Sequence, residues 1–379
     1  MKLRVDRDAL ADAVAWTAKS LPARPSVPVL AGALLTVSDG RLTISGFDYE
    51  VSSQVTLDVS ADASGTALVS GKLLAEIVKA LPAKPVDIAA DGSHVELTCG
   101  SARFTLPTMP VEDYPSLPEM PDAVGTVDAA AFAAAVAQTS VAAGKDDTLP
   151  TMTGVQVELS PSGISLLATD RYRMALKDLD WRPGSDLEVT TLIPAKALSD
   201  TAKALGAHGG EVTIAMPDAS AGSVGMVGFS SADRRTTSRV LDGQLPPLRS
   251  LLPTGFAAEL RVNTAELSSV ARRVALVTER NSQLRLTFDS DGLVVEAGGA
   301  EDAKASEALE CEYNGEPMKV AFNPQYLLDG LSAIAAPAAI FSFTEPGKPV
   351  VLTGGVLSED DEADYTGYRY MLQPLRFDS

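Results

Sequence analysis

The side chains that most often carry catalysis are scarce and scattered in this sequence of 379 residues. His94 and His208 are the only histidines, and neither has a cysteine or histidine neighbour at a metal-ligand spacing. Cys99 and Cys311 are the only cysteines, and two thiols so far apart fit a reducing compartment rather than a disulfide framework. We therefore expect no metal site and no disulfide.

Two short motifs could bind phosphate or a cation, but each lacks part of the pattern. Ser70-Gly71-Lys72 has no glycine at the required upstream spacing, so it predicts the start of a helix rather than a phosphate loop. The acidic run from Ser358 to Asp364 lacks the spacing and glycine of a calcium loop, so it predicts a solvated loop. No G-x-S-x-G nucleophile elbow and no dinucleotide-binding glycine motif is present.

These absences favour a binding scaffold with no cofactor over an enzyme. Two alternatives stay open. An enzyme could work through carboxylates and lysines alone, although the sequence singles out no such cluster. A scaffold could also bind only proteins and never nucleic acid.

The elements that would position any site follow a threefold repeat. In three places a valine that ends an expected strand precedes Asp6, Asp128 or Asn263, and an apolar residue follows four positions later. Asp and Asn are favoured N-caps, because their side-chain oxygens accept hydrogen bonds from the first backbone N–H groups of a helix. A helix with one apolar face is therefore predicted after each of these residues.

Each copy continues with a strand pair around a Gly-containing turn and then a second helix. The expected strand pairs are Ala33–Val37 with Leu42–Ser45, Val155–Leu159 with Ile164–Ala168, and Leu284–Phe288 with Leu293–Ala297. The expected second helices are 72–81, 196–205 and 326–334, the last with Pro324 at its start. The sequence thus predicts an α+β fold of three repeated modules, each with two helices packed on antiparallel sheets.

Proline-rich segments separate the copies. They run from Pro110 to Pro121 and from Pro246 to Pro253 and predict semi-rigid connectors. The expected domains are 1–121, 122–253 and 254–379.

Composition limits the cellular setting. The chain is 45% hydrophobic, yet no uninterrupted apolar run reaches about 18 residues, and the N-terminal sequence lacks the apolar region of a signal peptide. A cytoplasmic protein without a membrane span is expected. The net charge of −19 argues against a nucleic-acid partner, but only if the charge is spread evenly.

Four segments together resemble the bacterial DNA polymerase sliding clamp, the beta subunit of DNA polymerase III. They are Leu166–Leu176, Leu241–Pro246, Phe322–Leu328 and Tyr368–Phe377, and the resemblance extends over all three modules. It implies a head-to-tail homodimer whose six modules close a ring around duplex DNA. It also implies a protein that does no chemistry, since nucleotidyl transfer belongs to partner subunits.

The resemblance resolves the charge problem by placing helices on the inner wall of the ring and acidic residues outside. Phosphate contacts from that wall would be independent of DNA sequence and sensitive to salt. The DNA-facing residues that it implies are Lys19, Arg24, Lys72, Lys79, Lys145, Lys196, Lys203, Arg272 and Arg273.

Two further surfaces follow from the resemblance. Ring closure would join Arg103 and Phe104 of one chain to Leu276 and Val277 of the other. Partners, namely the replicative polymerase, the clamp loader and other proteins with a clamp-binding motif, would insert Leu and Phe side chains into a pocket between modules two and three. That pocket maps onto Met152, Thr169, Arg171, Tyr172, Arg173, Met174, Pro246, Ser250, Leu251, Met371, Gln373, Pro374, Leu375 and Arg376.

The sequence departs from the family mainly at this pocket. Gln373 stands where Met is usual, Leu248 where an aromatic is usual, and Met174 where Leu or Phe is common. A glutamine in an apolar pocket must find hydrogen-bond partners or cost about 1–3 kcal/mol. One hypothesis is a variant clamp that evades an inhibitor resembling a cyclic peptide, which would confer antibiotic resistance. The alternative is neutral drift.

Overall fold

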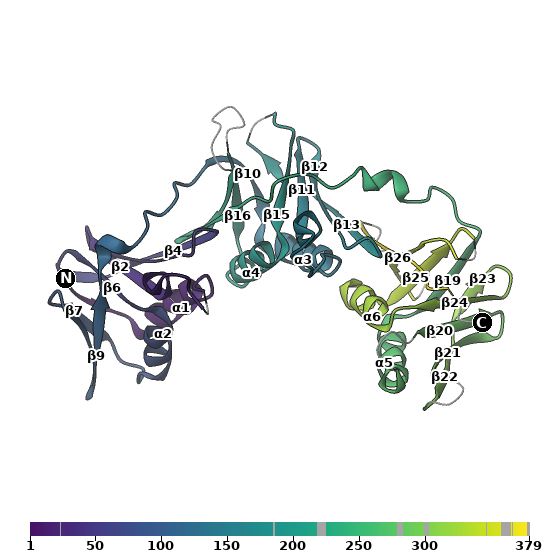
Figure 1. The fold of residues 1–379 in the computed structure, drawn as a ribbon, viewed down its shortest axis with the longest axis horizontal. Helices are drawn as coiled ribbons and strands as arrows, with labels where there is room; N and C mark the ends of the chain where they lie inside the picture. The colour runs from purple at the N-terminus through teal and green to yellow at the C-terminus, as the bar shows by residue number, and fades with distance from the viewer. Residues whose placement is uncertain are drawn as a thin grey trace. The chain divides into compact units, whose positions relative to one another are not determined.

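The structure is a computed structural model. It describes residues 1–22, 24–184, 186–217, 225–278, 283–298, 303–345, 347–357, 365 and 367–376. Over these residues the chain forms six α-helices and 27 β-strands. Figure 1 shows these helices and strands along the chain. They divide into two compact units, each containing β-sheet and helices. Unit 1 contains Met1–Ala130, Arg182–Ser185 and Asp200–Val240, and unit 2 contains Ala131–Trp181, Asp186–Ser199 and Leu241–Ser379.

A 14-stranded sheet forms the frame of unit 1, in the order β14-β10-β16-β17-β18-β4-β3-β2-β6-β9-β8-β7-β1-β5. Strands of the first and second expected modules join in this sheet, because β18 pairs antiparallel with β4. The bounds are β1 (Lys2–Val5), β2 (Gly32–Ser38), β3 (Arg41–Phe47), β4 (Val51–Asp58), β5 (Ser60–Ala63), β6 (Gly65–Ser70), β7 (Val86–Ala90), β8 (His94–Cys99), β9 (Ala102–Met109), β10 (Asp122–Asp128), β14 (Arg182–Pro183), β16 (Glu211–Met216), β17 (Met226–Ser231) and β18 (Arg234–Arg239).

Two sheets form the frame of unit 2. The larger has the order β15-β11-β12-β13-β27-β26-β25-β19-β23, and the smaller has the order β22-β21-β20-β24. The bounds are β11 (Gly154–Ser160), β12 (Gly163–Thr169), β13 (Arg173–Leu179), β15 (Val189–Pro194), β19 (Ala258–Asn263), β20 (Leu284–Asp289), β21 (Gly292–Ala297), β22 (Ala305–Leu309), β23 (Glu312–Asn314), β24 (Met318–Phe322), β25 (Ala338–Phe343), β26 (Val350–Gly355) and β27 (Tyr368–Leu372).

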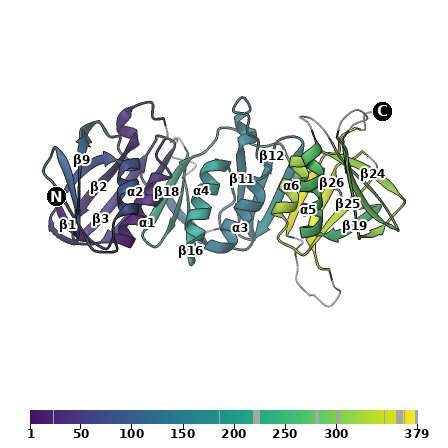
Figure 2. The same ribbon diagram turned by 90° about the horizontal axis from the view of Figure 1, so that it is seen from below.

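Helices pack in pairs against the sheets. In unit 1, α1 lies beside α2, and in unit 2, α5 lies beside α6, as Figure 2 also shows. The boundary between the units passes through α3 and α4. The bounds are α1 (Arg7–Ala18), α2 (Gly71–Ala80), α3 (Ala129–Ser140), α4 (Ala195–Gly206), α5 (Thr264–Val274) and α6 (Pro324–Ala333).

The helix starts agree with the sequence prediction. The Asp6 carboxylate accepts hydrogen bonds from the N–H groups of Asp8 and Ala9, and the Asn263 side chain caps α5 in the same way. Ser70 caps α2, so its motif begins a helix, as expected. The acidic run 358–364 lies outside the described residues.

Repetition between the first two modules extends to single residues. The β2–β3–β4 and β11–β12–β13 strands run at one constant offset along the chain, so Phe47 corresponds to Thr169. The turns after these two residues share an unusual backbone, since Tyr49 has φ 75° and Arg171 has φ 79°. The module boundaries at 121 and 253 stay a prediction.

The first connector packs against the core of module one. Tyr114, in the segment from Pro110 to Pro121, is 9% exposed and packs in a cluster with Val29, Phe47 and Leu68. Leu117 packs against the same cluster. The connector therefore covers the part of module one that corresponds to Thr169 and its surroundings in module two.

A buried cation lies where α1 meets β18 in unit 1. Arg234 is 5% exposed, its guanidinium stands over the Trp16 ring at 5.0 Å, and it donates to the Asp12 carboxylate. His208 Nε2 lies 2.5 Å from Arg234 Nη1 and 3.4 Å from the same carboxylate. His208 thus contacts both members of the Arg234–Asp12 ion pair within unit 1. No helix among the described residues is long and apolar enough to span a membrane.

Candidate functional site

One pocket of unit 2 brings together most of the residues that the sequence assigned to a partner site. Its volume is ≈ 240 Å³, and most of its lining is apolar. The residues that line it are Met152, Thr169, Arg171, Tyr172, Arg173, Met174, Pro246, Leu248, Leu251, Pro349, Met371 and Gln373.

The floor of the pocket is part of a hydrophobic core. Met174 is 1% exposed and packs with Leu167, Leu176, Leu192 and other buried residues. Met152, Leu248 and Met371 are partly buried against the same cluster. Because these side chains are fixed from below, the pocket presents a preformed apolar surface.

One wall is the turn between β12 and β13. The Asp170 carboxylate oxygen Oδ1 accepts the N–H groups of Tyr172 and Arg173 at 3.0 and 3.1 Å. The Thr169 hydroxyl donates to Arg173 O at 2.6 Å and accepts the N–H of Arg171 at 3.1 Å. These bonds hold Arg171 in the left-handed region, at φ 79°, which a non-glycine residue seldom adopts without such support.

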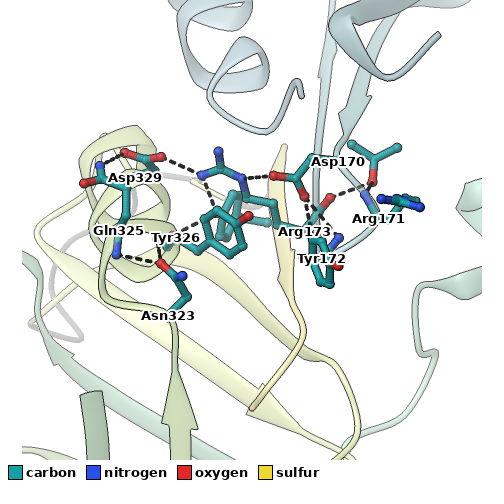
Figure 3. A network of polar contacts seen from close by, with 10 residues as sticks. Asp170, Arg171, Tyr172, Arg173, Asn323, Gln325, Tyr326 and Asp329 are labelled. Carbon is teal, nitrogen blue, oxygen red and sulfur yellow. Dashed lines mark hydrogen bonds and ion pairs between the residues drawn. The ribbon is translucent and has the colours of Figure 1, made fainter. Parts of the chain in front are cut away.

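Arg173 fastens this turn to the third module, as Figure 3 shows. Its side chain is 4% exposed; Nε lies 2.9 Å from Asp170 Oδ2 and Nη1 lies 2.6 Å from Asp329 Oδ2. Nη1 also lies 3.4 Å from the Tyr370 hydroxyl. Burial lowers the pKa of Arg173, but Tyr370, Asp329 and Asp170 raise it by more, so the guanidinium stays charged.

Aromatic rings extend the same wall. Tyr172 is 53% exposed, and its ring stacks on that of Tyr326 with centroids 6.3 Å apart. The Arg173 guanidinium lies over the Tyr326 ring at 4.3 Å, within the range of a cation–π contact. Burial and the Asp170 carboxylate raise the pKa of Tyr326, so its hydroxyl remains protonated at neutral pH.

The second connector forms the opposite wall. Leu251 ends a short 3-10 helix over Leu248–Leu251 and is 56% exposed, which is unlike a core leucine. Arg249 ties this helix to the sheet, because it donates to the Ser165 hydroxyl and lies 3.3 Å from Glu158 and 3.2 Å from Asp178. The polar contacts of Arg249 therefore fix the short helix in a position that leaves the Leu251 side chain exposed to solvent.

Gln373 lies at the rim of the pocket with an exposed side chain. Its Nε2 lies 3.4 Å from Gly347 O and 3.5 Å from Pro374 O, while its backbone N–H donates to Tyr172 O at 2.9 Å. The expected desolvation cost is therefore avoided, since the amide remains in contact with water and polar groups.

The structure does not place every predicted pocket residue in the lining. Ser250, Pro374, Leu375 and Arg376 do not line the pocket, although Ser250 and Pro374 adjoin lining residues in the chain. Sequence reasoning missed Pro349, and it treated Leu248 only as a departure from the family. Pro349 directly precedes β26, which pairs with β27, the strand that leads to Gln373. A prediction of this strand pairing from the sequence would have placed Pro349 at the pocket.

The predicted cationic residues all lie on exposed positions, most of them on helices. Lys72 and Lys79 lie on α2, Lys196 and Lys203 on α4, and Arg272 on α5. The other predicted residues are Lys19 just after α1, Arg24 and Lys145 in loops, and Arg273 on α5.

Arg273 differs from the rest because its guanidinium is paired. It donates to both carboxylate oxygens of Glu307, at 3.0 and 2.5 Å, and this pairing raises the pKa of Arg273.

The residues predicted to close the ring differ in exposure. Phe104 is 37% and Leu276 83% exposed, Arg103 is exposed and Val277 is half-buried. Leu276 is the most exposed large apolar side chain among the described residues.

This arrangement is suited to binding an apolar partner. The described residues contain no group of three metal-ligating side chains. The pocket offers an apolar floor, aromatic and guanidinium groups on one wall and an exposed leucine on the other. The fold and the pocket define a binding protein built from repeated α+β modules.

Comparison with known proteins gives the family. Residues 1–118, 126–247 and 249–366 match the N-terminal, central and C-terminal domains of the DNA polymerase III beta subunit. The chain is 49% identical to the beta sliding clamp of Streptomyces coelicolor over 99% of both chains, and 41% identical to the beta sliding clamp homolog GriR of Streptomyces muensis over 100% of both. The clamp of Pseudomonas aeruginosa, solved bound to griselimycin, superposes with a TM-score of 0.89 at 26% identity and covers 100% of both chains.

The chain belongs to the DNA polymerase III beta subunit family, the beta sliding clamps. Its fold is the DNA clamp fold, as the sequence predicted. The expectation of a non-catalytic processivity factor is confirmed, and the enzymatic and purely protein-binding alternatives are not favoured.

Proposed function

We propose that the pocket lined by Met152, Met174 and Leu251 is the site at which this clamp holds the polymerase and other partners. The observation that carries the proposal is Leu251, which stays exposed beside a buried apolar floor. An apolar anchor from a partner would cover Leu251 and fill the pocket, in the manner of an interface hot spot. Ser250, Pro374, Leu375 and Arg376 would contact the partner beyond the pocket itself.

A binding measurement tests this proposal. A labelled peptide with the Leu and Phe anchors of a clamp-binding motif is titrated with the clamp, and fluorescence anisotropy reports binding. Saturable binding that is lost when both anchors are replaced by Ala supports the pocket. Equal binding of the Ala peptide would contradict it.

The exposed cations on α2, α4 and α5 would line the DNA channel of a cytoplasmic homodimeric ring. Chain ends would meet through Arg103 and Phe104 on one protomer and Leu276 and Val277 on its partner. Contacts to phosphate would then be independent of DNA sequence, while retention would depend on the closed ring. Arg273 would contribute less than Arg272, since Glu307 already pairs with it.

Loading tests the ring. A clamp loader places the protein on nicked circular DNA, and the DNA is then cut once. A ring stays on the circle and slides off the linear product. Salt-resistant retention on the linear DNA would contradict topological binding.

Gln373 supports a second proposal, that the pocket favours the polymerase over a pocket-directed inhibitor. The pocket rim here carries a hydrated amide instead of the apolar thioether that is usual in the family. An inhibitor that needs an apolar rim would have to desolvate this amide, which costs about 1–3 kcal/mol, or roughly 5- to 150-fold in affinity.

Gln373→Met is the matched variant for this second proposal. Griselimycin, which the Pseudomonas aeruginosa clamp binds, serves as the inhibitor probe. We expect Gln373→Met to bind griselimycin more tightly while its affinity for the polymerase peptide stays within about twofold. Equal griselimycin affinity in both proteins would leave neutral drift as the explanation of Gln373.

A further inference from the structure

The turn wall of the pocket depends on a group outside the pocket. Tyr172 is more than half exposed, and Arg171 has a left-handed backbone, so the turn has little packing of its own. The hydrogen bonds within the turn all involve Thr169 and Asp170, and Tyr172 O also accepts the backbone N–H of Gln373 from outside the turn. The guanidinium of Arg173 adds a buried ion pair between the turn and Asp329 of α6.

Arg173 can do this only while its charge is balanced. A buried guanidinium needs hydrogen-bond acceptors on its N–H groups, because it has lost its water. Asp170 satisfies Nε, whereas Nη1 has Asp329 at 2.6 Å and the Tyr370 hydroxyl at 3.4 Å. Without the Asp329 carboxylate, Nη1 would keep only the long contact to Tyr370.

Asp329 is itself held in place by α6. The Gln325 side chain donates to Asp329 Oδ1 at 2.7 Å from one turn earlier, which leaves Oδ2 for Arg173 (Figure 3). Asn323 caps the helix by accepting the N–H groups of Gln325 and Tyr326. The same helix supplies the Tyr326 ring that lies under both Arg173 and Tyr172.

The turn between β12 and β13 also positions the pocket rim at Gln373. Tyr172 O accepts the backbone N–H of Gln373 at 2.9 Å, and the register of β13 with β27 sets Arg173 opposite Leu372. A shift of the turn would therefore move both the aromatic wall and the residue at the rim.

We propose that Asp329, which does not line the pocket, is a positioning residue that acts through Arg173 to hold the Tyr172 wall in its peptide-binding position. The proposal rests on the pocket being the partner site. Partners that never touch α6 would still lose affinity when the Asp329 charge is removed.

Asp329→Asn tests this, because the amide has the same shape without the charge. We expect the peptide Kd to rise about tenfold, mainly through faster dissociation, a size typical of coupling between neighbouring sites. Asp329→Glu keeps the carboxylate and should restore most of the affinity. Glu266→Gln removes an exposed charge from α5 in the same unit and should bind like wild type.

A measurement without peptide separates this inference from the function of the pocket. The Gln373 amide proton, which donates to Tyr172 O, should exchange with solvent about tenfold faster in Asp329→Asn than in wild type, as expected for a locally loosened segment. Faster exchange with no peptide binding by the wild type would support the positioning role and refute the partner site. Wild-type Kd and exchange rate in Asp329→Asn would overturn the positioning role.

Discussion

Leu251→Ala should separate partner binding from folding. The change removes three carbon atoms, worth about 2.4 kcal/mol if fully buried, at about 0.8 kcal/mol each. Leu251 is 56% exposed in the free protein, so a partner that covers it completely would bury that fraction. The loss of binding free energy is then about 1.3 kcal/mol, or roughly a ninefold rise in Kd.

Leu251→Ala should lower the stability of the fold less than a truncation at the buried floor of the pocket does. The free energy of unfolding of Leu251→Ala should fall by about 1 kcal/mol at most, since half the side chain is already in water. Met174→Ala is the contrasting variant, because Met174 is 1% exposed and its truncation should cost about 2–5 kcal/mol of stability.

Fluorescence anisotropy with the labelled clamp-binding peptide measures the Kd, and urea unfolding measures stability. Leu73→Ala is the matched control, because Leu73 is 42% exposed and lies on α2 away from the pocket lining. Wild-type affinity in Leu251→Ala, with the control also unchanged, would refute the assignment of the connector as a pocket wall.

Three further outcomes are expected. Burial raises the pKa of Tyr114 to about 12, so the stability that its neutral phenol contributes is complete below pH 10 and is lost as the pH rises through 12. Tyr114→Phe should reduce this loss of stability in urea unfolding at increasing pH, and identical pH profiles of the two proteins would contradict the expectation. Asp12→Asn should lower the unfolding free energy by about 1–3 kcal/mol, because it weakens the pairing of buried Arg234; calorimetry that detects no change would count against this. Leu276→Asp should shift the homodimer towards monomer in light scattering, unless Leu276 lies outside the interface.

The repeated elements were predictable because their signals are local. Asp6 and Asn263 cap helices through bonds two and three residues away, and the hairpin turns follow from Gly and Asp in short segments. The long 14-stranded sheet was not predicted, since nothing local specifies that β18 pairs with β4.

The pocket was predictable only in part. Resemblance to the family located the turn at Arg171–Met174, but no spacing in the sequence links Arg173 to Asp329 or Tyr172 to Tyr326. Such pairs form only after distant strands and helices have packed. The proline-rich segment around Tyr114 predicted a spacer, because pattern reasoning cannot show that an aromatic in a connector returns to the core.

Phe47 in module one and Thr169 in module two occupy corresponding positions, and this difference sets how many such pockets each chain has. In module one a ring fills the space together with Tyr114, whereas in module two a small hydroxyl leaves the space open. Of these two corresponding positions in the described residues, only the one in module two is open, so a homodimer has two such pockets. With the pocket as the partner site proposed above, the polymerase, the clamp loader and other partners would compete for two sites on each ring, so their relative concentrations as well as their affinities would decide which of them a loaded clamp carries.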